Sequence, residues 1–114
     1  MVRMEDPAAR LAAGVAGYAL GVSPEEILNA PRGSAETAFA RQVAMYLCHV
    51  AFEFSLSRVA LAFGRDRSTV AHACHCVEDR RDEAAFDAWI DVLEAMLRDA
   101  PAPRSAVAAA EARS

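Results

Sequence analysis

The 114-residue chain has a formal net charge of −4, with 54% hydrophobic and 25% charged residues, which excludes a disordered or collagen-like chain. This length holds one hydrophobic core, and no apolar run reaches the roughly 18 residues of a membrane span. The charged start, MVRMEDPAAR, lacks the apolar centre of a signal peptide, and three cysteines are an odd number for a disulfide framework. We therefore expect a one-domain cytoplasmic protein that does not bind membranes.

Helix signals dominate the chain from its first residues. Alanine and arginine are frequent and β-branched residues are sparse, which favours an all-α fold. Residues 7–20 are the first predicted helix, with Pro7 at its start and Gly21 after its end. Apolar residues recur along it at helical spacing, namely Leu11, Val15, Tyr18 and Ala19. The stretch SPEE (23–26) then begins a short helix, and APRGSAET (30–37) reads as a loop.

Four further helices are predicted in the rest of the chain. They span about 39–54, 55–64, 67–81 and 83–98. Ser55 and Asp66 are the natural N-caps of the second and third of these. Residues 1–100 therefore form the expected domain, a compact bundle of about six helices. The segment 101–114 has few large apolar residues and is expected to be a flexible tail.

The two helices that meet at Gly64 have the spacing of a helix-turn-helix. Such a unit needs a small residue in its first helix, a glycine four positions later and a β-branched residue six positions further on. Ala60, Gly64 and Val70 occupy these places. The small residue allows close approach, and the glycine adopts the left-handed conformation of the turn.

A helical projection of residues 67–81 separates a core face from a polar face. Val70, Ala73, Cys74 and Val77 share the first, and Ser68, His72, His75 and Asp79 share the second. The first turn carries Arg67, Ser68 and Thr69, where a recognition helix meets base edges. The charge agrees, because residues 41–76 have a local net charge of +2 within an acidic chain.

The same projection argues against a metal or a catalytic site. Cys74 and Cys76 lie about 200° apart on a helix and cannot grip one ion. His72 and Cys76 could, but two ligands do not make a structural zinc site. Cys74 faces the core, and no Gly-rich phosphate loop or paired carboxylate lies nearby. We expect no enzyme activity, metal, cofactor or nucleotide.

Several motifs in order resemble the C-terminal DNA-binding domain of DnaA-type chromosomal replication initiators. They are RQVAMYL (41–47), SLSRVALAFG (55–64) and RDRSTVAHAC (65–74). VAGYALGVSPEEIL (15–28) and FDAWIDVLEAMLR (86–98) are similar to the opening and closing helices of that domain. The resemblance covers about residues 10–98 and implies a six-helix, Trp-repressor-like fold.

The resemblance also implies roles for particular residues at a double-stranded DNA interface. It places Asp66, Arg67, Ser68 and Thr69 at the base-reading positions, and Arg32 is the nearest candidate for a residue that reads the minor groove. The resemblance places Arg41, Gln42, Leu56, Thr69 and His72 at positions that contact the DNA backbone, and we expect further backbone contacts from Ser57, Arg65 and His75. The chain departs from the family where one glycine of a Gly-Gly pair is missing, and where Arg67 and Ser68 replace a histidine and a threonine. These changes are expected to alter which bases are preferred.

Three functions stay open on this evidence. The first is a sequence-specific, nucleoid-associated transcriptional regulator, a repressor, that reads the major groove with helix 67–81. The second is a replication regulator that competes with the initiator for its DNA boxes. The third is a protein-binding adaptor whose helix-turn-helix has lost DNA. A single weak reader favours a homodimer or a heteromeric protein partner through the C-terminal helix. The apolar stripe of that helix is wide for a helix that faces only the core, so part of it is a candidate interface; it consists of Phe86, Trp89, Ile90, Leu93, Met96 and Leu97.

Overall fold

The computed structural model describes residues 6–29 and 33–100, and this part of the chain is all-α, without strands. Its helices are α1 (Pro7–Leu20), α2 (Pro24–Asn29), α3 (Ala35–Ala51), α4 (Leu56–Phe63), α5 (Arg67–Arg80) and α6 (Ala84–Asp99). The prediction of an all-α bundle of about six helices is thus confirmed. The expected tail at 101–114 and the minor-groove candidate Arg32 lie outside the described residues. Within the described residues, no helix is long and apolar enough to cross a membrane.

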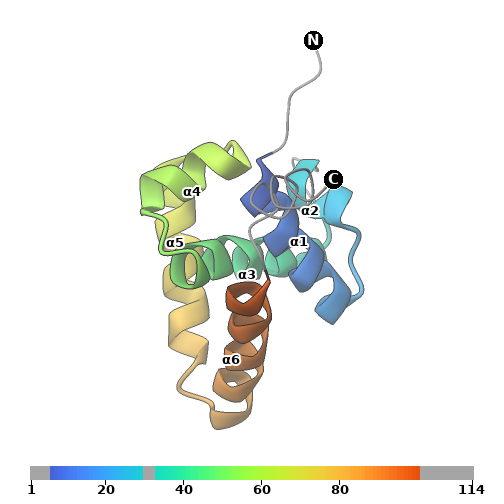
Figure 1. The fold of residues 1–114 in the computed structure, drawn as a ribbon, viewed down its shortest axis with the longest axis vertical. Coiled ribbons are helices and arrows are strands. Elements are labelled where there is room, and N and C mark those ends of the chain that lie inside the picture. Colours follow the sequence, from blue (N-terminus) through green and yellow to red (C-terminus); the bar gives the residue numbers. More distant parts are fainter. Residues whose placement is uncertain (1–5, 30–32, 101–114) are drawn as a thin grey trace, which may run out of the picture.

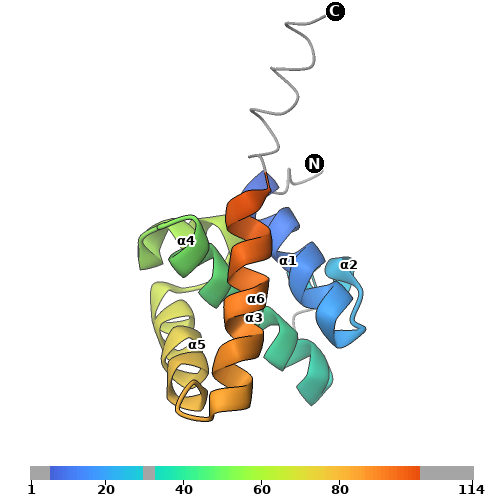
Figure 2. The same cartoon turned by 60° about the horizontal axis from the view of Figure 1, so that its bottom comes forward.

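Helix α3 forms the centre of the bundle (Figures 1 and 2). It packs against every other described helix, and its side chains from Val43 to Cys48 are buried. Helices α1 and α2 lie on one side of it, and α4 and α5 lie on the other. The largest fully buried side chains come from helices α2 to α6 and include Ile27, Met45, Leu47, Val59, Val70 and Ile90. The same core therefore supports both α4 and α5, the two helices that meet at Gly64.

Helix α1 turns its small residues inward and its large apolar residues outward. Its buried residues are Ala9, Ala12, Ala13, Ala16 and Gly17. At Gly17 an added Cβ would lie 2.3 Å from the carbonyl oxygen of Val22, so the fold requires a glycine there. The stripe predicted from periodicity is only half-buried at Leu11 and Val15, and Tyr18 is 85% exposed. Helical periodicity gives α1 two regular faces, one of small residues and one of large apolar residues. Because α1 approaches the bundle closely, the face of small residues is the one that is buried.

The boundaries of α3 differ from the predicted 39–54. The helix begins at Ala35 because the Ser34 hydroxyl accepts a 3.1 Å hydrogen bond from the Thr37 amide, so part of the predicted loop is helical. It ends at Ala51, and Glu53 then adopts a positive φ of 58°. This break places Ser55 at the start of α4.

The apolar stripe of α6 belongs mainly to the core. Phe86, Ile90, Leu93 and Leu97 are buried, which leaves Trp89 half-buried and Met96 43% exposed. Four of the six stripe residues thus pack inside their own domain, and the part of the stripe left for the expected interface is Trp89 and Met96.

Arg81, directly after α5, connects three helices. Its Nε donates a 2.6 Å hydrogen bond to Asp87, and its Nη1 donates a 3.0 Å bond to the hydroxyl of Tyr46 in α3. Asp91 and Glu94 of α6 also form ion pairs with it. Burial alone would lower the pKa of Arg81, but the hydrogen bonds and charges of Asp87 and Tyr46 together raise it. The end of α5 is thereby fixed against α3 and α6.

Candidate nucleic-acid interface

The turn between α4 and α5 has defined geometry. Gly64 adopts a left-handed conformation, with φ 64° and ψ 40°. The Arg65 amide donates a 3.0 Å hydrogen bond to the Ala60 carbonyl, and the Gly64 amide donates a 3.3 Å bond to the Leu61 carbonyl. This pair of bonds is a Schellman motif, which ends a helix and reverses the chain. A turn with one glycine is therefore sufficient here.

The packing across this turn confirms the spacing found in the sequence. Ala60 of α4 is buried, and Val70 of α5 is fully buried. Ala73 and Val77 continue the buried face of α5, and Cys74 lies at its edge, half-buried. Close contact between the two helices fixes the direction of α5 and leaves its opposite face exposed.

The four predicted base-reading residues before and in the first turn of α5 are all exposed, namely Asp66, Arg67, Ser68 and Thr69. Asp66 has the extended backbone of an N-cap, with φ −72° and ψ 149°, but its side chain makes no capping hydrogen bond. Its carboxylate therefore accepts no hydrogen bond from the amides of the helix it precedes. The amide groups of this first turn also point outward with the positive end of the helix dipole. The amides suit a negatively charged or hydrogen-bond-accepting group, whereas the carboxylate suits a hydrogen-bond donor.

The residues expected to contact the DNA backbone are exposed to different degrees. Ser57, His72 and His75 are exposed, whereas Gln42, Leu56 and Arg65 are half-buried. Their elements lie on both sides of the turn, with Gln42 on α3, Leu56 and Ser57 at the start of α4, and His72 and His75 on α5. The polar face predicted for α5 is thus present.

Arg41 lies differently from the other candidates, because it is buried, with 9% of its surface exposed. Its Nε donates a 2.7 Å hydrogen bond to the Ile27 carbonyl, and its Nη2 donates a 3.2 Å bond to the Glu26 carbonyl. Burial and then the nearby charge of Arg65 lower the pKa of Arg41. The two cationic groups are therefore close enough to repel each other, and an anion between them would relieve that repulsion.

Arg58 is one of the arginines that make residues 41–76 net positive, and it has an acidic partner from elsewhere in the chain. Its Nη2 lies 2.9 Å from a carboxylate oxygen of Asp6, and its guanidinium lies 4.5 Å from the centre of the Phe54 ring. The Asp6 carboxylate also caps α1 by accepting a 2.9 Å bond from the Ala8 amide. Asp-Pro before an alanine-rich helix is a capping signal that the sequence reading overlooked.

The C-terminal half of α5 becomes acidic. His75 lies 3.5 Å from Asp79, and Glu78 accepts a 2.7 Å hydrogen bond from the Tyr46 hydroxyl. Asp82 and Glu83 follow the helix and are exposed. A phosphate backbone would be repelled here, so only the N-terminal half of α5 suits a nucleic acid.

The cysteines are distributed as the helical projection predicts. Burial raises the pKa of Cys48 to about 12 and that of Cys74 to about 11. Cys76 lies on the outer side, where its Sγ is 3.5 Å from the Nε2 of His72. In the described part of the chain, no group of three or more His, Cys, Asp or Glu side chains is placed to hold a metal ion.

Comparison with known proteins agrees with this arrangement. The family model of the bacterial dnaA protein helix-turn-helix matches residues 13–77, which is more than half of the chain. The chromosomal replication initiator protein DnaA of Lachnoclostridium phytofermentans is 40% identical over 81 residues, which are 69% of this chain and 18% of that protein. That of Aquifex aeolicus is 38% identical over 87 residues, which are 75% of this chain and 21% of that protein.

A solved structure is similar as well. The crystal structure of a DNA replication initiation factor superposes with a TM-score of 0.71 at 32% identity, over 81% of this chain and 28% of that chain. The chain thus spans about a fifth of the length of the curated relatives named above. Because the matched family region contains α4, the turn and most of α5, the chain belongs to the bacterial dnaA helix-turn-helix family.

Proposed function

We propose that this chain binds double-stranded DNA in a sequence-specific manner, with the first turn of α5 in the major groove. The supporting observation is the exposed row Asp66–Thr69, which stands at the start of a helix whose direction is fixed by the turn at Gly64. Arg67 suits the two acceptors of guanine, and the methyl group of Thr69 suits that of thymine. The Asp66 carboxylate can accept from the amino group of cytosine.

Contacts to the DNA backbone would position this reading turn. We assign them to Gln42, Leu56, Ser57, Arg65, His72 and His75, with Arg32 directed to the minor groove. Arg41 could add a backbone contact only through its other N–H groups, because its Nε and Nη2 already donate to the Ile27 and Glu26 carbonyls. We propose that its main role is to position α2. With few basic residues and acidic groups along the second half of α5, one copy should bind weakly and with a shallow salt dependence.

Two biological roles follow from such a reader, which would lie on the nucleoid. The leading proposal is a transcriptional regulator that represses by occupying its DNA sites. The second is a replication regulator that competes for the initiator's sites, which is favoured by the replication-initiator relatives. The net charge of −4 also permits an adaptor that binds protein instead of DNA.

The DNA-binding proposal is tested by selecting duplexes from a random pool and measuring affinity by fluorescence anisotropy. Arg67→Ala should weaken binding by about 5- to 150-fold, because one good base contact contributes about 1–3 kcal/mol. Arg98→Ala is the matched control, since Arg98 is an exposed arginine on α6 outside the reading turn. Equal affinities of wild type and Arg67→Ala would contradict the reading role. No binding by wild type at low salt would favour the adaptor.

The two DNA-based roles are separated by mapping bound sites across the genome. Sites scattered at promoters, with raised transcription after deletion, support the repressor. Clustered sites at the replication origin, shared with the initiator, support the replication regulator.

A further inference from the structure

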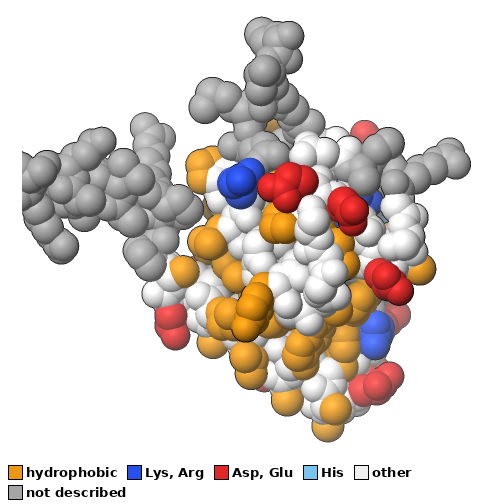
Figure 3. All heavy atoms as spheres, turned by 90° about the vertical axis from the view of Figure 1, so that its right-hand side faces the viewer, with side chains coloured by type: hydrophobic (Ala, Val, Ile, Leu, Met, Phe, Trp, Pro, Cys, Tyr) orange, Lys and Arg blue, Asp and Glu red, His pale blue; other side chains and the backbone are white. Residues whose placement is uncertain are grey.

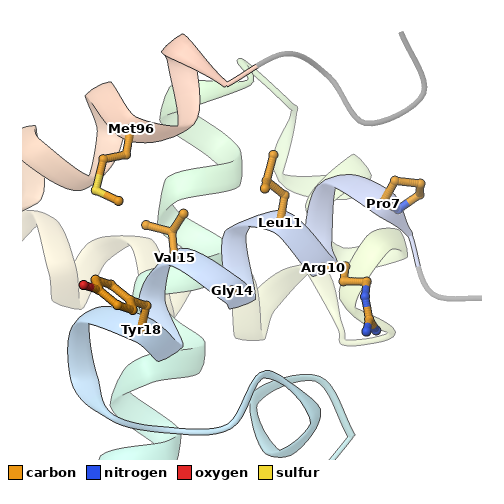
Figure 4. Close-up of a pocket in the computed structure, with 7 residues that line it drawn as sticks. All are labelled: Pro7, Arg10, Leu11, Gly14, Val15, Tyr18 and Met96. Atoms are coloured by element: carbon orange, nitrogen blue, oxygen red, sulfur yellow. The ribbon is translucent and has the colours of Figure 1, made fainter. Parts of the chain in front are cut away.

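Helix α1 borders an apolar groove that the fold leaves open. The groove has a volume of about 510 Å³ and is lined by Pro7, Arg10, Leu11, Gly14, Val15, Tyr18 and Met96. Met96 reaches from α6 towards Val15 and Tyr18 (Figure 4). Figure 3 faces the α1 and α2 side of the molecule and shows hydrophobic side chains gathered there. We call these seven residues the α1 groove.

Gly14 lines the α1 groove, and no neighbour in the described fold would exclude a side chain there. A Cβ added there would meet nothing within 4 Å, in contrast to Gly17, where the Val22 carbonyl lies 2.3 Å away. Glycine in the interior of a helix is destabilising relative to alanine. Gly14 therefore suits a second backbone that approaches α1 closely from outside.

The residues on either side of Gly14 are spaced so that one copy of α1 can pair with another copy. Arg10 stands one helical turn before Gly14, and Tyr18 stands one turn after it, both on the side of α1 seen in Figure 4. If two α1 helices cross antiparallel at Gly14, Arg10 of each copy meets Tyr18 of the other. A guanidinium over a tyrosine ring is favourable, and two-fold symmetry forms the pair twice. In the single chain Arg10 lies 3.9 Å from Glu25 in an exposed ion pair, a weak interaction that such a pairing can replace.

We propose that two copies of this chain associate through the α1 groove, with their α1 helices crossing at Gly14. Leu11, Val15 and Met96 would supply apolar contact, and Tyr18 would lose most of its 85% exposure. One helix crossing buries less than the roughly 800 Å² per partner of a standard interface, so the dimer is weak and depends on concentration. The proposal rests on α1 and α6 and is independent of DNA binding.

Sedimentation equilibrium of the full chain tests the association. The mass should rise from 12.2 kDa towards twice that value between about 1 μM and about 1 mM protein. Gly14→Gln keeps a good helix former but adds bulk at the crossing, and it should weaken association by at least about tenfold. Tyr18→Ala should do the same, whereas Tyr18→Phe keeps the ring and should dimerise. Leu61→Gln is the control, because Leu61 is an exposed apolar residue on α4 outside the groove.

Cross-linking locates the two-fold axis. With Cys74→Ser and Cys76→Ser in place, Gly14→Cys should form a disulfide between copies under mild oxidation, because residue 14 faces itself across the axis. Leu61→Cys should not. Circular dichroism confirms that each variant is folded. The proposal is overturned by a protomer mass at every concentration, which is the outcome if residues 101–114 or another protein covers the groove. A dimer that survives Gly14→Gln, or that gives no Gly14→Cys cross-link, overturns it equally.

Discussion

The Nε of Arg41 lies 2.7 Å from the carbonyl oxygen of Ile27 and donates a hydrogen bond to it. Carbonyls in the last turn of a helix have no partner within the helix, and Arg41 satisfies two of them at the end of α2. The guanidinium is a charged donor in a buried position, so each of these bonds is of the stronger kind. Arg41 thus ties α2 to α3, just before the chain reaches the segment that contains Arg32.

Arg41→Lys should destabilise the chain by about 1–3 kcal/mol, because an ammonium group cannot donate in both directions of the planar fork. Urea unfolding followed by circular dichroism measures the change, with Arg98→Lys as an exposed control. The opposite pattern, with stability unchanged and DNA affinity reduced, would show that Arg41 contacts DNA and does not position α2.

Gly64→Ala should destabilise the chain by about 1 kcal/mol or more, since its φ of 64° is unfavourable for a residue with a Cβ. Gly64→Asn should be milder, because asparagine tolerates the left-handed region. Thermal unfolding gives the order wild type, Asn, Ala. If alanine proved as stable as glycine, the Schellman turn would not require the left-handed conformation at this residue.

Tyr46→Phe should destabilise the chain by about 1–2 kcal/mol, because the hydroxyl donates to Glu78 at 2.7 Å and accepts from Arg81 at 3.0 Å. A double-mutant cycle with Arg81→Met should show a coupling energy of at least about 0.5 kcal/mol. Strictly additive effects would contradict the connection between α3 and the end of α5. Tyr18→Phe removes an exposed hydroxyl and serves as the control.

Alkaline pH should destabilise the fold through its buried thiols. Burial raises the pKa of Cys48 from 9.0 to about 12 and that of Cys74 from 9.0 to about 11. Above pH 9 the unfolded chain loses these protons while the folded chain keeps them, so the free energy of unfolding falls as pH rises towards 11–12. The fall is at most about 1.4 kcal/mol per pH unit for each thiol.

Urea unfolding at about pH 8 and about pH 10.5 measures this fall. Cys48→Ala should reduce it, because Cys48 is fully buried and contributes one of the two raised pKa values. Cys76→Ala, which removes a half-buried thiol from the outer side of α5, is the matched control. An equal fall in wild type and Cys48→Ala would assign the alkaline sensitivity to other groups.

Local signals predicted the unit from α4 to α5 well, and long-range contacts explain what was missed. Ser55, Gly64 and the spacing from Ala60 to Val70 act within a few residues of each other, so they are visible in the sequence. The burial of Arg41 depends on carbonyls 14 and 15 residues away, which no local pattern reveals. The outward stripe of α1 was missed for the same reason, because packing against α3 decides which of two regular faces is buried.

The proposed reading turn and the core use separate sets of residues, and this has a consequence for divergence. Asp66, Arg67, Ser68 and Thr69 are exposed, while Ala60 and Val70 hold the two helices together from inside. A change in the first set alters hydrogen bonding at the surface and leaves the packing intact. Under the proposed function, new recognition sequences can therefore arise one substitution at a time, without passing through unfolded intermediates.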